Sequence, residues 1–370
     1  DNTVRDLTLR LDATWQPAAD HRGAFGLWST RFDTDYRALL NDSTELFHRG
    51  SDTWLHAAFV QDKWMYRDLE LTAGLRASYY DGTKRAYWEP RLAAVYALGE
   101  NVSLTGAWGR YHQFVNRIVN EDVLQGSREF WLTADADLLP TSAEHRVLGV
   151  KYENADLSFR MEAYDKRLED IVQYSRRFQQ TADYANFFFF GNGTARGLEF
   201  FLQKKAGDLT GWIGYTLAKV DYTFPNLNGG LAFPAEQDHR HDVKTVLKYT
   251  LGSWTFSGTW VFATGNAFTA PESQYFIKLL NGETLSYIHI GGKNAARLPD
   301  YHQLDLSVST HFEWANSSAD FGVSFFNAYN RKNVSYRAYN LTTAPITITD
   351  VTLLGFTPTG TITLTMPILM

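Results

Sequence analysis

Apolar and polar residues alternate along most of the chain, and this pattern predicts β-strands. Between Leu69 and Tyr79 an apolar or small residue stands at every second position, with polar residues such as Glu70 and Arg76 between them. The segment from Gln303 to Phe312 repeats the pattern. Strict alternation places successive side chains on opposite faces of a sheet. We therefore expect an all-β chain whose strands have one apolar and one polar face.

The alternating segments are too long for a typical soluble sheet. They run for roughly 10–13 residues, whereas soluble strands usually have about 5–6 and a tilted strand crosses a bilayer in about 9–11. The polar face is rich in small residues, as a wet or filled lumen would be. Aromatic residues recur near strand ends, where the girdles of a transmembrane barrel lie; they are Trp15, Trp64, Tyr66, Tyr79, Trp254 and Trp314. The pattern predicts an antiparallel transmembrane β-barrel.

Short and long connections alternate along the sequence. Turn signals divide it into about fifteen strands, and every other connection is tight, as at 66–68, 99–101 and 252–253. The connections between these are mostly long; they cover 33–51, 114–141, 168–193, 222–239, 265–300 and 334–357. Outer-membrane barrels have short periplasmic turns and long outer loops. Residues 1–370 are therefore expected to form one barrel domain.

The alternation of connections also orients the chain. The last strand, 359–370, follows a long loop and so runs toward the periplasm, and counting back gives the first strand the same direction. Bacterial single-chain barrels have an even number of strands with both ends in the periplasm. We therefore expect that an N-terminal part of the barrel precedes Asp1, unless the strand count is off by one.

Composition excludes other classes of protein. The 370 residues include no Cys, so no disulfide framework or thiol nucleophile is possible. A net charge of -6 argues against nucleic acid as a partner, because nucleic-acid binding needs a basic face. No run of about 18 apolar residues occurs, which excludes a helical membrane protein. The 11 Trp, 20 Tyr and 25 Phe are too many for a disordered chain.

Six segments of the chain carry recognisable motifs. They are YWEPRL at 87–92, WGRYHQ at 108–113, LPTSAE at 139–144, GNGTARGLE at 191–199, RLPDYHQLD at 297–305 and FNAYNRKN at 326–333. Each motif is weak alone, but together and in this order they resemble the C-terminal part of the barrel of TonB-dependent outer-membrane receptors.

The resemblance implies a 22-stranded barrel around an N-terminal plug domain, with this chain forming the last two-thirds of the barrel. It also implies a bacterial outer-membrane location and the uptake of a scarce, bulky solute, such as a siderophore-type metal chelate, which binds at the outer loops and lumen. Its expected partners are outer-membrane lipid, a TonB-type energy-coupling protein acting through the plug, and the small-molecule ligand. Such barrels usually end in an aromatic residue, whereas this sequence ends in Met370.

Candidate ligand-binding residues lie in or beside the long connections. Large apolar side chains in exposed loops often contact a ligand or partner, which favours Phe130, Trp131, Phe188 and Phe189. Packing of one loop on another is the alternative interpretation. Tyr111 and His112 stand at the outer end of a strand and are placed to line the vestibule.

No catalytic residue, metal site or cofactor is predicted, and the protein is not expected to be an enzyme. The sequence has no G-x-S-x-G nucleophile elbow. His239 and His241 stand two positions apart but lack an identifiable third metal ligand. Asp135 and Asp137 are interpreted as solvated or at best a loose cation site, and the motif residue Arg297 as part of the architecture.

Two other functions stay open from sequence alone. A passive porin-like diffusion channel has a comparable length and an aqueous pore. That alternative predicts a loop folded into the lumen opposite a ladder of Arg, a cluster that the sequence does not display. A barrel that acts as a receptor or adhesin for a partner at its loops is the other alternative.

Overall fold

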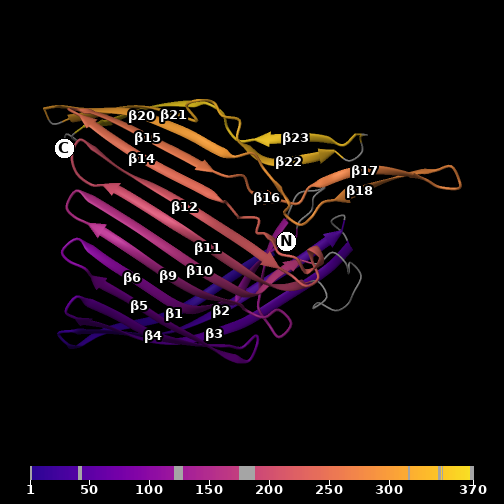
Figure 1. Ribbon diagram of the computed structural model, residues 1–370, viewed down its shortest axis with the longest axis horizontal. Helices are drawn as coiled ribbons and strands as arrows, with labels where there is room; N and C mark the ends of the chain where they lie inside the picture. The colour runs from indigo at the N-terminus through magenta and orange to yellow at the C-terminus, as the bar shows by residue number, and fades with distance from the viewer. Residues whose placement is uncertain are drawn as a thin grey trace. The chain divides into compact units, whose positions relative to one another are not determined.

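The computed structural model describes residues 2–40, 44–120, 128–174, 188–315, 317–340, 343 and 345–366, and these are built almost wholly from β-strands and their connections (Figure 1). The chain divides into two compact units, residues 1–148, 164–196 and 221–233 in the first and residues 149–163, 197–220 and 234–370 in the second. Within the described residues, no helix is long and apolar enough to cross a membrane.

The first unit is a series of antiparallel hairpins in sequence order. Each strand pairs with the next one along the chain: β1 (Asn2–Ala18), β2 (His21–Leu40), β3 (Thr44–Tyr66), β4 (Leu69–Tyr80), β5 (Arg85–Ala97) and β6 (Val102–Gln113). A separate hairpin joins β7 (Val115–Asn120) to β8 (Arg128–Thr133). The unit also holds parts of β9 (Thr141–Glu153), β10 (Leu157–Tyr174), β11 (Phe188–Lys204) and β12 (Leu209–Thr223).

The second unit holds the remaining parts of β9 to β12 and continues the same pattern. From β12 onward, consecutive antiparallel pairs join β14 (His241–Leu251), β15 (Trp254–Ala263), β20 (Tyr301–Trp314), β21 (Ser317–Phe326) and β24 (Thr357–Thr365). The long connections contain the hairpins β17 (Pro271–Lys278)–β18 (Thr284–Ile290) and β22 (Val334–Asn340)–β23 (Thr347–Thr352). They also contain the two-residue strands β13 (Phe233–Pro234), β16 (Ala267–Phe268) and β19 (Ala296–Arg297).

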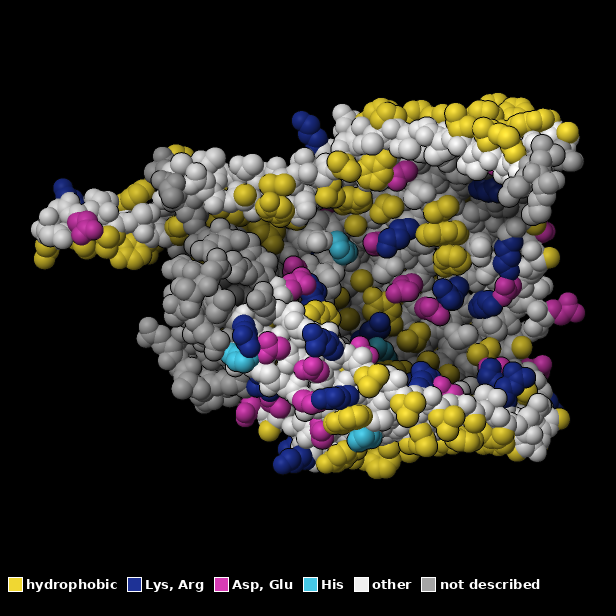
Figure 2. All heavy atoms as spheres, turned by 180° about the vertical axis from the view of Figure 1, so that it is seen from behind, with side chains coloured by type: hydrophobic (Ala, Val, Ile, Leu, Met, Phe, Trp, Pro, Cys, Tyr) yellow, Lys and Arg dark blue, Asp and Glu magenta, His cyan; other side chains and the backbone are white. Residues whose placement is uncertain are grey.

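The strands confirm the predicted separation of apolar and polar faces. Leu11 on β1 lies opposite Leu27 on β2, and both side chains are exposed. One position along, Arg10 lies opposite Trp28 on the other face. Figure 2 shows charged side chains of both signs on the face of the strands turned to the viewer, while hydrophobic side chains crowd the edges. The exposed apolar face is the one that a lipid environment would solvate.

Several strands extend into ranges predicted as loops, so the loop prediction was wrong for those parts. β2 and β3 stay paired as far as Leu40 and Thr44, supported by a 2.7 Å hydrogen bond between His48 Nε2 and Asp35 Oδ1. The range 114–141 contains β7 and β8, and β10 and β11 extend into 168–193. Cross-strand pairing continues past the apolar segment because backbone hydrogen bonds do not depend on side-chain polarity. The predicted end of the last strand, at Met370, lies outside the described residues.

The resembling motifs near the C-terminus serve the architecture. Asn327 is fully buried, and its amide donates to the carbonyls of Arg331 (2.8 Å) and Leu354 (3.1 Å) while its Oδ1 accepts from the Arg331 N–H (2.9 Å). The Asn327 N–H donates to Asp305 Oδ1 at 2.8 Å. Arg297 donates to the carbonyls of Asp238 (2.7 Å) and Gly265 (3.0 Å). These polar side chains replace the ladder hydrogen bonds that are missing where strands end.

Asn327→Ala is expected to lower the free energy of local opening at the Arg331 amide by about 2–4 kcal/mol. The variant removes the three hydrogen bonds of the Asn327 side chain. It also places an alanine, whose side chain cannot hydrogen-bond the backbone, at a φ of 51° in the left-handed region. Asn327→Gly tolerates that φ and should cost about 1 kcal/mol less. Hydrogen exchange of the Arg331 amide measures both effects. Unchanged protection in the Ala variant would contradict the structural role.

Candidate functional site

A basic, aromatic pocket lies on the polar face of β1 to β5. Its volume is about 350 Å³, and it lies within the first unit. The side chains that line it from the polar face are Arg10, Trp28, Phe59, Gln61, Arg76 and Arg91. We refer to this group as the lumen pocket.

Strand register brings these residues together from distant parts of the sequence. Arg10 lies opposite Trp28 across β1–β2, Phe59 opposite Arg76 across β3–β4, and Gly74 opposite Arg91 across β4–β5. Antiparallel partners on one face have Cβ atoms about 4.5–5.5 Å apart. Gly26 makes room for the Phe59 ring, because a Cβ at residue 26 would come within 2.3 Å of it.

Guanidinium groups stack on aromatic rings around the lumen pocket. The Arg76 guanidinium lies 4.1 Å from the centre of the Trp28 ring, and that of Arg10 lies 5.6 Å from the same ring. The Arg91 guanidinium lies 4.7 Å from the Tyr111 ring. Such cation–π contacts orient the cations without neutralising them. The pocket therefore presents guanidinium groups that lie against aromatic rings.

Two carboxylates compensate part of this charge: Asp12, which accepts a hydrogen bond from Arg10 Nε at 2.6 Å, and the buried Glu89. Glu89 is 1% exposed and lies 3.2 Å from Arg76 Nε and 3.5 Å from Arg91 Nη2. The backbone N–H of His112 donates to Glu89 Oε1 at 2.7 Å. A buried carboxylate persists only with such partners, so Glu89 fixes the positions of the cations around it.

The structure brings two predicted ligand residues beside the lumen pocket. Tyr111 lies under Arg91, with its ring centre 4.8 Å from that of His145. His112 places Nδ1 3.5 Å from Glu89 Oε1. Both are therefore near cations and aromatic rings that sequence reasoning did not single out.

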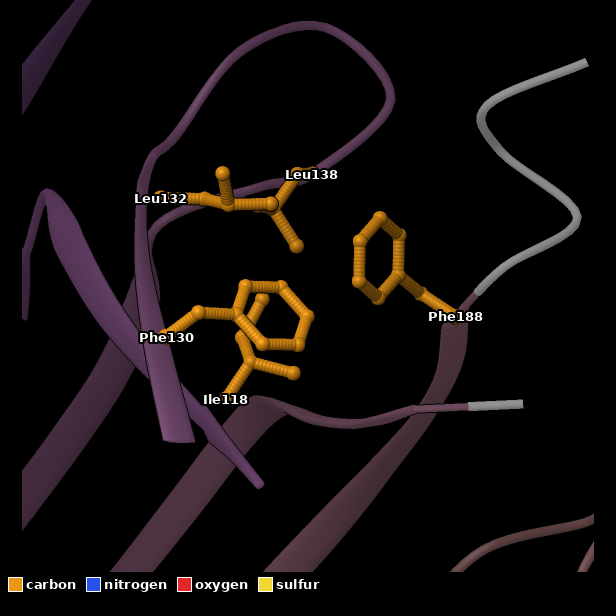
Figure 3. Packing of buried hydrophobic residues seen from close by; sticks show 5 residues of the cluster. All are labelled: Ile118, Phe130, Leu132, Leu138 and Phe188. Carbon is orange, nitrogen blue, oxygen red and sulfur yellow. The ribbon is translucent and has the colours of Figure 1, made fainter. Parts of the chain in front are cut away.

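Three other predicted residues pack inside small cores at the loops. Phe130 and Phe188 are 2% and 6% exposed and meet Ile118, Leu132 and Leu138, all of which point toward one another in Figure 3. Phe189 packs in a neighbouring cluster with Ile171, Phe224 and Phe233. These phenylalanines therefore pack loop on loop, which was the alternative interpretation from the sequence.

Trp131 differs from its neighbour Phe130. Its side chain is 41% exposed, because alternation on β8 turns it away from the core. Its backbone is fixed by Asn2, whose amide donates to the Trp131 carbonyl (3.1 Å) and whose Oδ1 accepts the Trp131 N–H (2.8 Å). Trp131 is thus a rigidly mounted, accessible aromatic side chain.

Arg10 and Arg76 were missed because they carry no local signal, and Arg91 was noted only as part of the YWEPRL motif. Arg10, Arg76 and Arg91 are far apart in sequence, and each stands on an ordinary alternating strand. The sequence did offer one signal, the alternation of faces along each strand. It places all three arginines on the polar face, and the order of hairpins places β1 to β5 side by side. Only the register shows that the three charges converge.

The residues considered for metal binding have protein partners. His239 Nδ1 lies 2.6 Å from the Thr264 carbonyl oxygen, and His241 Nδ1 lies 2.9 Å from the Tyr215 hydroxyl. Asp135 is ion-paired with Arg49, and its Oδ1 accepts the N–H of Asp137 at 2.7 Å. Among the residues that the structure describes, no three His, Asp or Glu side chains form a potential metal site.

Lys293 lies in the connection between β18 and β19, and its ionisation should make the stability of this connection depend on pH. Burial lowers its pKa to about 8. A lysine whose folded pKa lies below its unfolded value opposes folding while it is charged. The stability of this connection should therefore rise as pH increases from about 8 to about 10, and stay flat below about 8. Hydrogen exchange across 291–295 measures the rise, and Lys293→Gln should abolish it; a rise that persists in this variant would contradict the assignment.

Phe130→Ala and Trp131→Ala form a matched pair on β8. Phe130→Ala should destabilise the β7–β8 hairpin by about 3–5 kcal/mol, because it empties a buried site. Trp131→Ala should change that stability by about 0.5 kcal/mol or less, because its side chain is exposed. Hydrogen exchange of the hairpin amides distinguishes the two. Equal effects would contradict the difference in burial.

Solved structures with the same fold are receptors for iron chelates. The ferripyoverdine receptor of the outer membrane of Pseudomonas aeruginosa bound to ferripyoverdine matches with a TM-score of 0.61 and 12% identity, over 98% of this chain and 48% of the other. A mutant of the ferric enterobactin receptor PfeA from Pseudomonas aeruginosa gives 0.57 and 15%, over 90% and 49%. The siderophore receptor PirA from Acinetobacter baumannii gives 0.58 and 11%, over 89% and 51%.

The chain spans about half the length of these structures. No curated protein sequence matches it. The family model described as TonB dependent receptor-like, beta-barrel, matches residues 1–355. This match covers nearly the whole chain and agrees with the antiparallel strands and two-faced alternation. The chain therefore belongs to the TonB-dependent receptor β-barrel family of bacterial outer-membrane proteins.

Proposed function

We propose that this chain forms part of the barrel of a TonB-dependent receptor that imports a siderophore-type metal chelate across the outer membrane. The ligand binds at the outer loops and in the lumen. A plug domain, supplied by sequence outside these residues, gates the passage, and a TonB-type protein provides the energy. The barrel is completed to 22 strands by the same outside sequence, and its apolar face contacts outer-membrane lipid.

The family match over residues 1–355 carries this proposal. It is supported by the lumen pocket, where Arg10 and Arg76 lie over the Trp28 ring and Arg91 lies over the neighbouring Tyr111 ring. Ferric chelates with carboxylate or catecholate groups are anionic and bulky, so a pocket with guanidinium groups on aromatic rings complements both properties. Trp131, on β8 within the long connection 114–141, adds an accessible aromatic surface.

The family match does not favour the porin alternative. The structure does bring arginines together on the polar face, a cluster that the sequence did not reveal. These arginines stack on Trp28 and Tyr111 and surround Glu89, which favours a shaped recognition site over an open ladder. The protein is thus proposed to bind and transport its solute without catalysis.

Charge reversal in the lumen pocket tests the ligand class. Arg10→Glu should weaken binding of anionic ferric chelates at least about tenfold, equivalent to about 1.4 kcal/mol, and should change binding of a neutral hydroxamate chelate much less. Arg5→Glu is the matched control, because Arg5 lies on the same strand but on the apolar-face side. Calorimetry on the full-length receptor, with ferric citrate and ferric enterobactin as anionic probes, measures the affinities. Equal effects of the two variants would overturn the pocket's role.

Growth under iron limitation tests the transport itself. Cells whose only chelate receptor is the full-length protein should grow on a chelate that binds it, and deletion of the TonB-type protein should abolish that growth. Growth that survives the deletion would overturn energy-coupled transport and favour passive diffusion.

A further inference from the structure

Four arginines lie on the apolar-face side of neighbouring strands in the first unit. They are Arg110 on β6, Arg146 on β9, Arg167 on β10 and Arg196 on β11. The function proposed above does not use them, because they face away from the lumen pocket. We call them the arginine strip.

Strand parity establishes which face these arginines occupy. Leu148, two positions beyond Arg146 on β9, is 71% exposed and marks the apolar face. Ser142, on the same face of β9, hydrogen-bonds Glu169 of β10 at 3.5 Å. Asp165 and Arg167 lie four and two positions before Glu169, so they share this face. Arg196 reaches the same face because its Nε donates to Asp165 Oδ1 at 2.5 Å.

Two carboxylates pair the arginines of the strip into two neighbouring ionic groups. Glu144 lies 2.6 Å from Arg146 Nη2 and 4.0 Å from Arg110 Nη2. Asp165 lies 2.5 Å from Arg196 Nε and 3.5 Å from Arg167 Nε. With Glu169, the strip has four cations and three anions.

The cations project further from the surface than the anions do. The four arginine side chains are between 51% and 65% exposed, whereas Glu144 and Asp165 are 22% and 27% exposed. The carboxylates therefore hold the inner side of the guanidinium groups, whose remaining N–H donors face outward. Free guanidinium edges of this kind suit bidentate contacts with phosphate oxygens.

The position of the strip along the strands matches the edge of a bilayer. Arg146, Asp165 and Arg196 each lie about eight or nine residues from the short turn of their own strand, and a tilted strand crosses the hydrocarbon layer in about 9–11 residues. Trp108, on the same face of β6, donates from its indole N–H to Glu144 at 3.1 Å. Tryptophan is typical of the membrane–water interface. The strip therefore lies at the level of lipid headgroups.

We propose that the arginine strip binds the phosphate groups of an anionic lipid in the outer leaflet. The inference rests on the proposed outer-membrane function, because it requires lipid against the apolar face. Charge complementarity identifies the occupant: outward guanidinium edges meet phosphate, while Leu148 and Trp108 beside them meet acyl chains and the interface. A soluble chelate would enter on the opposite, polar face.

Lipid binding to the full-length receptor, folded in detergent micelles, tests this proposal. The probe is lipid A with two phosphates, compared with the same lipid after removal of both phosphates, and native mass spectrometry reports bound lipid. The unaltered chain should retain the phosphorylated form at least about tenfold more tightly. The double variant Arg146→Gln/Arg196→Gln should lose this preference, whereas Arg146→Lys/Arg196→Lys should keep part of it, because lysine retains charge but not the bidentate fork.

Arg160→Gln is the matched control. Arg160 is on β10 like Arg167 and is 54% exposed, but it lies on the opposite face, so its loss should not change lipid binding. The single variant Arg196→Gln, at the most exposed position, covers the case in which the double variant does not fold. Equal retention of both lipid forms, or equal effects of the strip and control variants, would overturn the proposal. The two proposals are tested separately. The Arg10→Glu test measures chelate binding and bears on the proposed function, whereas the lipid test bears on the arginine strip.

Discussion

Backbone hydrogen bonding between neighbouring strands is the constraint on which this protein depends. A strand whose apolar face meets hydrocarbon has no water to satisfy its N–H and C=O groups, so each must pair with the next strand. Successive hairpins meet this requirement with the shortest connections, as β3 and β4 do through the turn after Tyr66. The side chains are then free to divide into an apolar and a polar face, and every functional feature of the chain follows from that division.

Charged side chains on the polar face are held in place by ion pairs and hydrogen bonds with one another. Glu89 is nearly inaccessible and is stabilised by Arg76, Arg91 and the His112 backbone. Because a buried carboxylate without partners is costly, the same contacts that satisfy Glu89 also fix the guanidinium groups on Trp28 and Tyr111. A preorganised cationic site loses less conformational entropy when an anion binds.

The long connections are stabilised by small cores of their own. Phe130 and Phe188 come from segments far apart in sequence, yet they share one cluster with Leu138. A second cluster joins Phe189 to Phe224. This packing holds the described parts of these connections together and leaves the Trp131 side chain exposed. A binding surface benefits when its side chains are already fixed, because the conformational entropy lost on ordering a mobile loop opposes binding.

The sequence by itself determined the strands, their two faces and the family. Alternation has a period of two whatever the partner strand, so segments such as Leu69–Tyr80 can be recognised locally. It also predicted that Tyr111 and His112 line the vestibule, from their place at a strand end; the structure places them beside Arg91 and Glu89, and their contact with a ligand stays a prediction. Only the tertiary structure decided that Arg10, Arg76 and Arg91 converge, that Phe130 is buried while Trp131 is exposed, and that four arginines lie together on the apolar-face side of neighbouring strands. These facts depend on register and strand length, which are set by cross-strand pairing and loop packing between residues that are remote in the sequence.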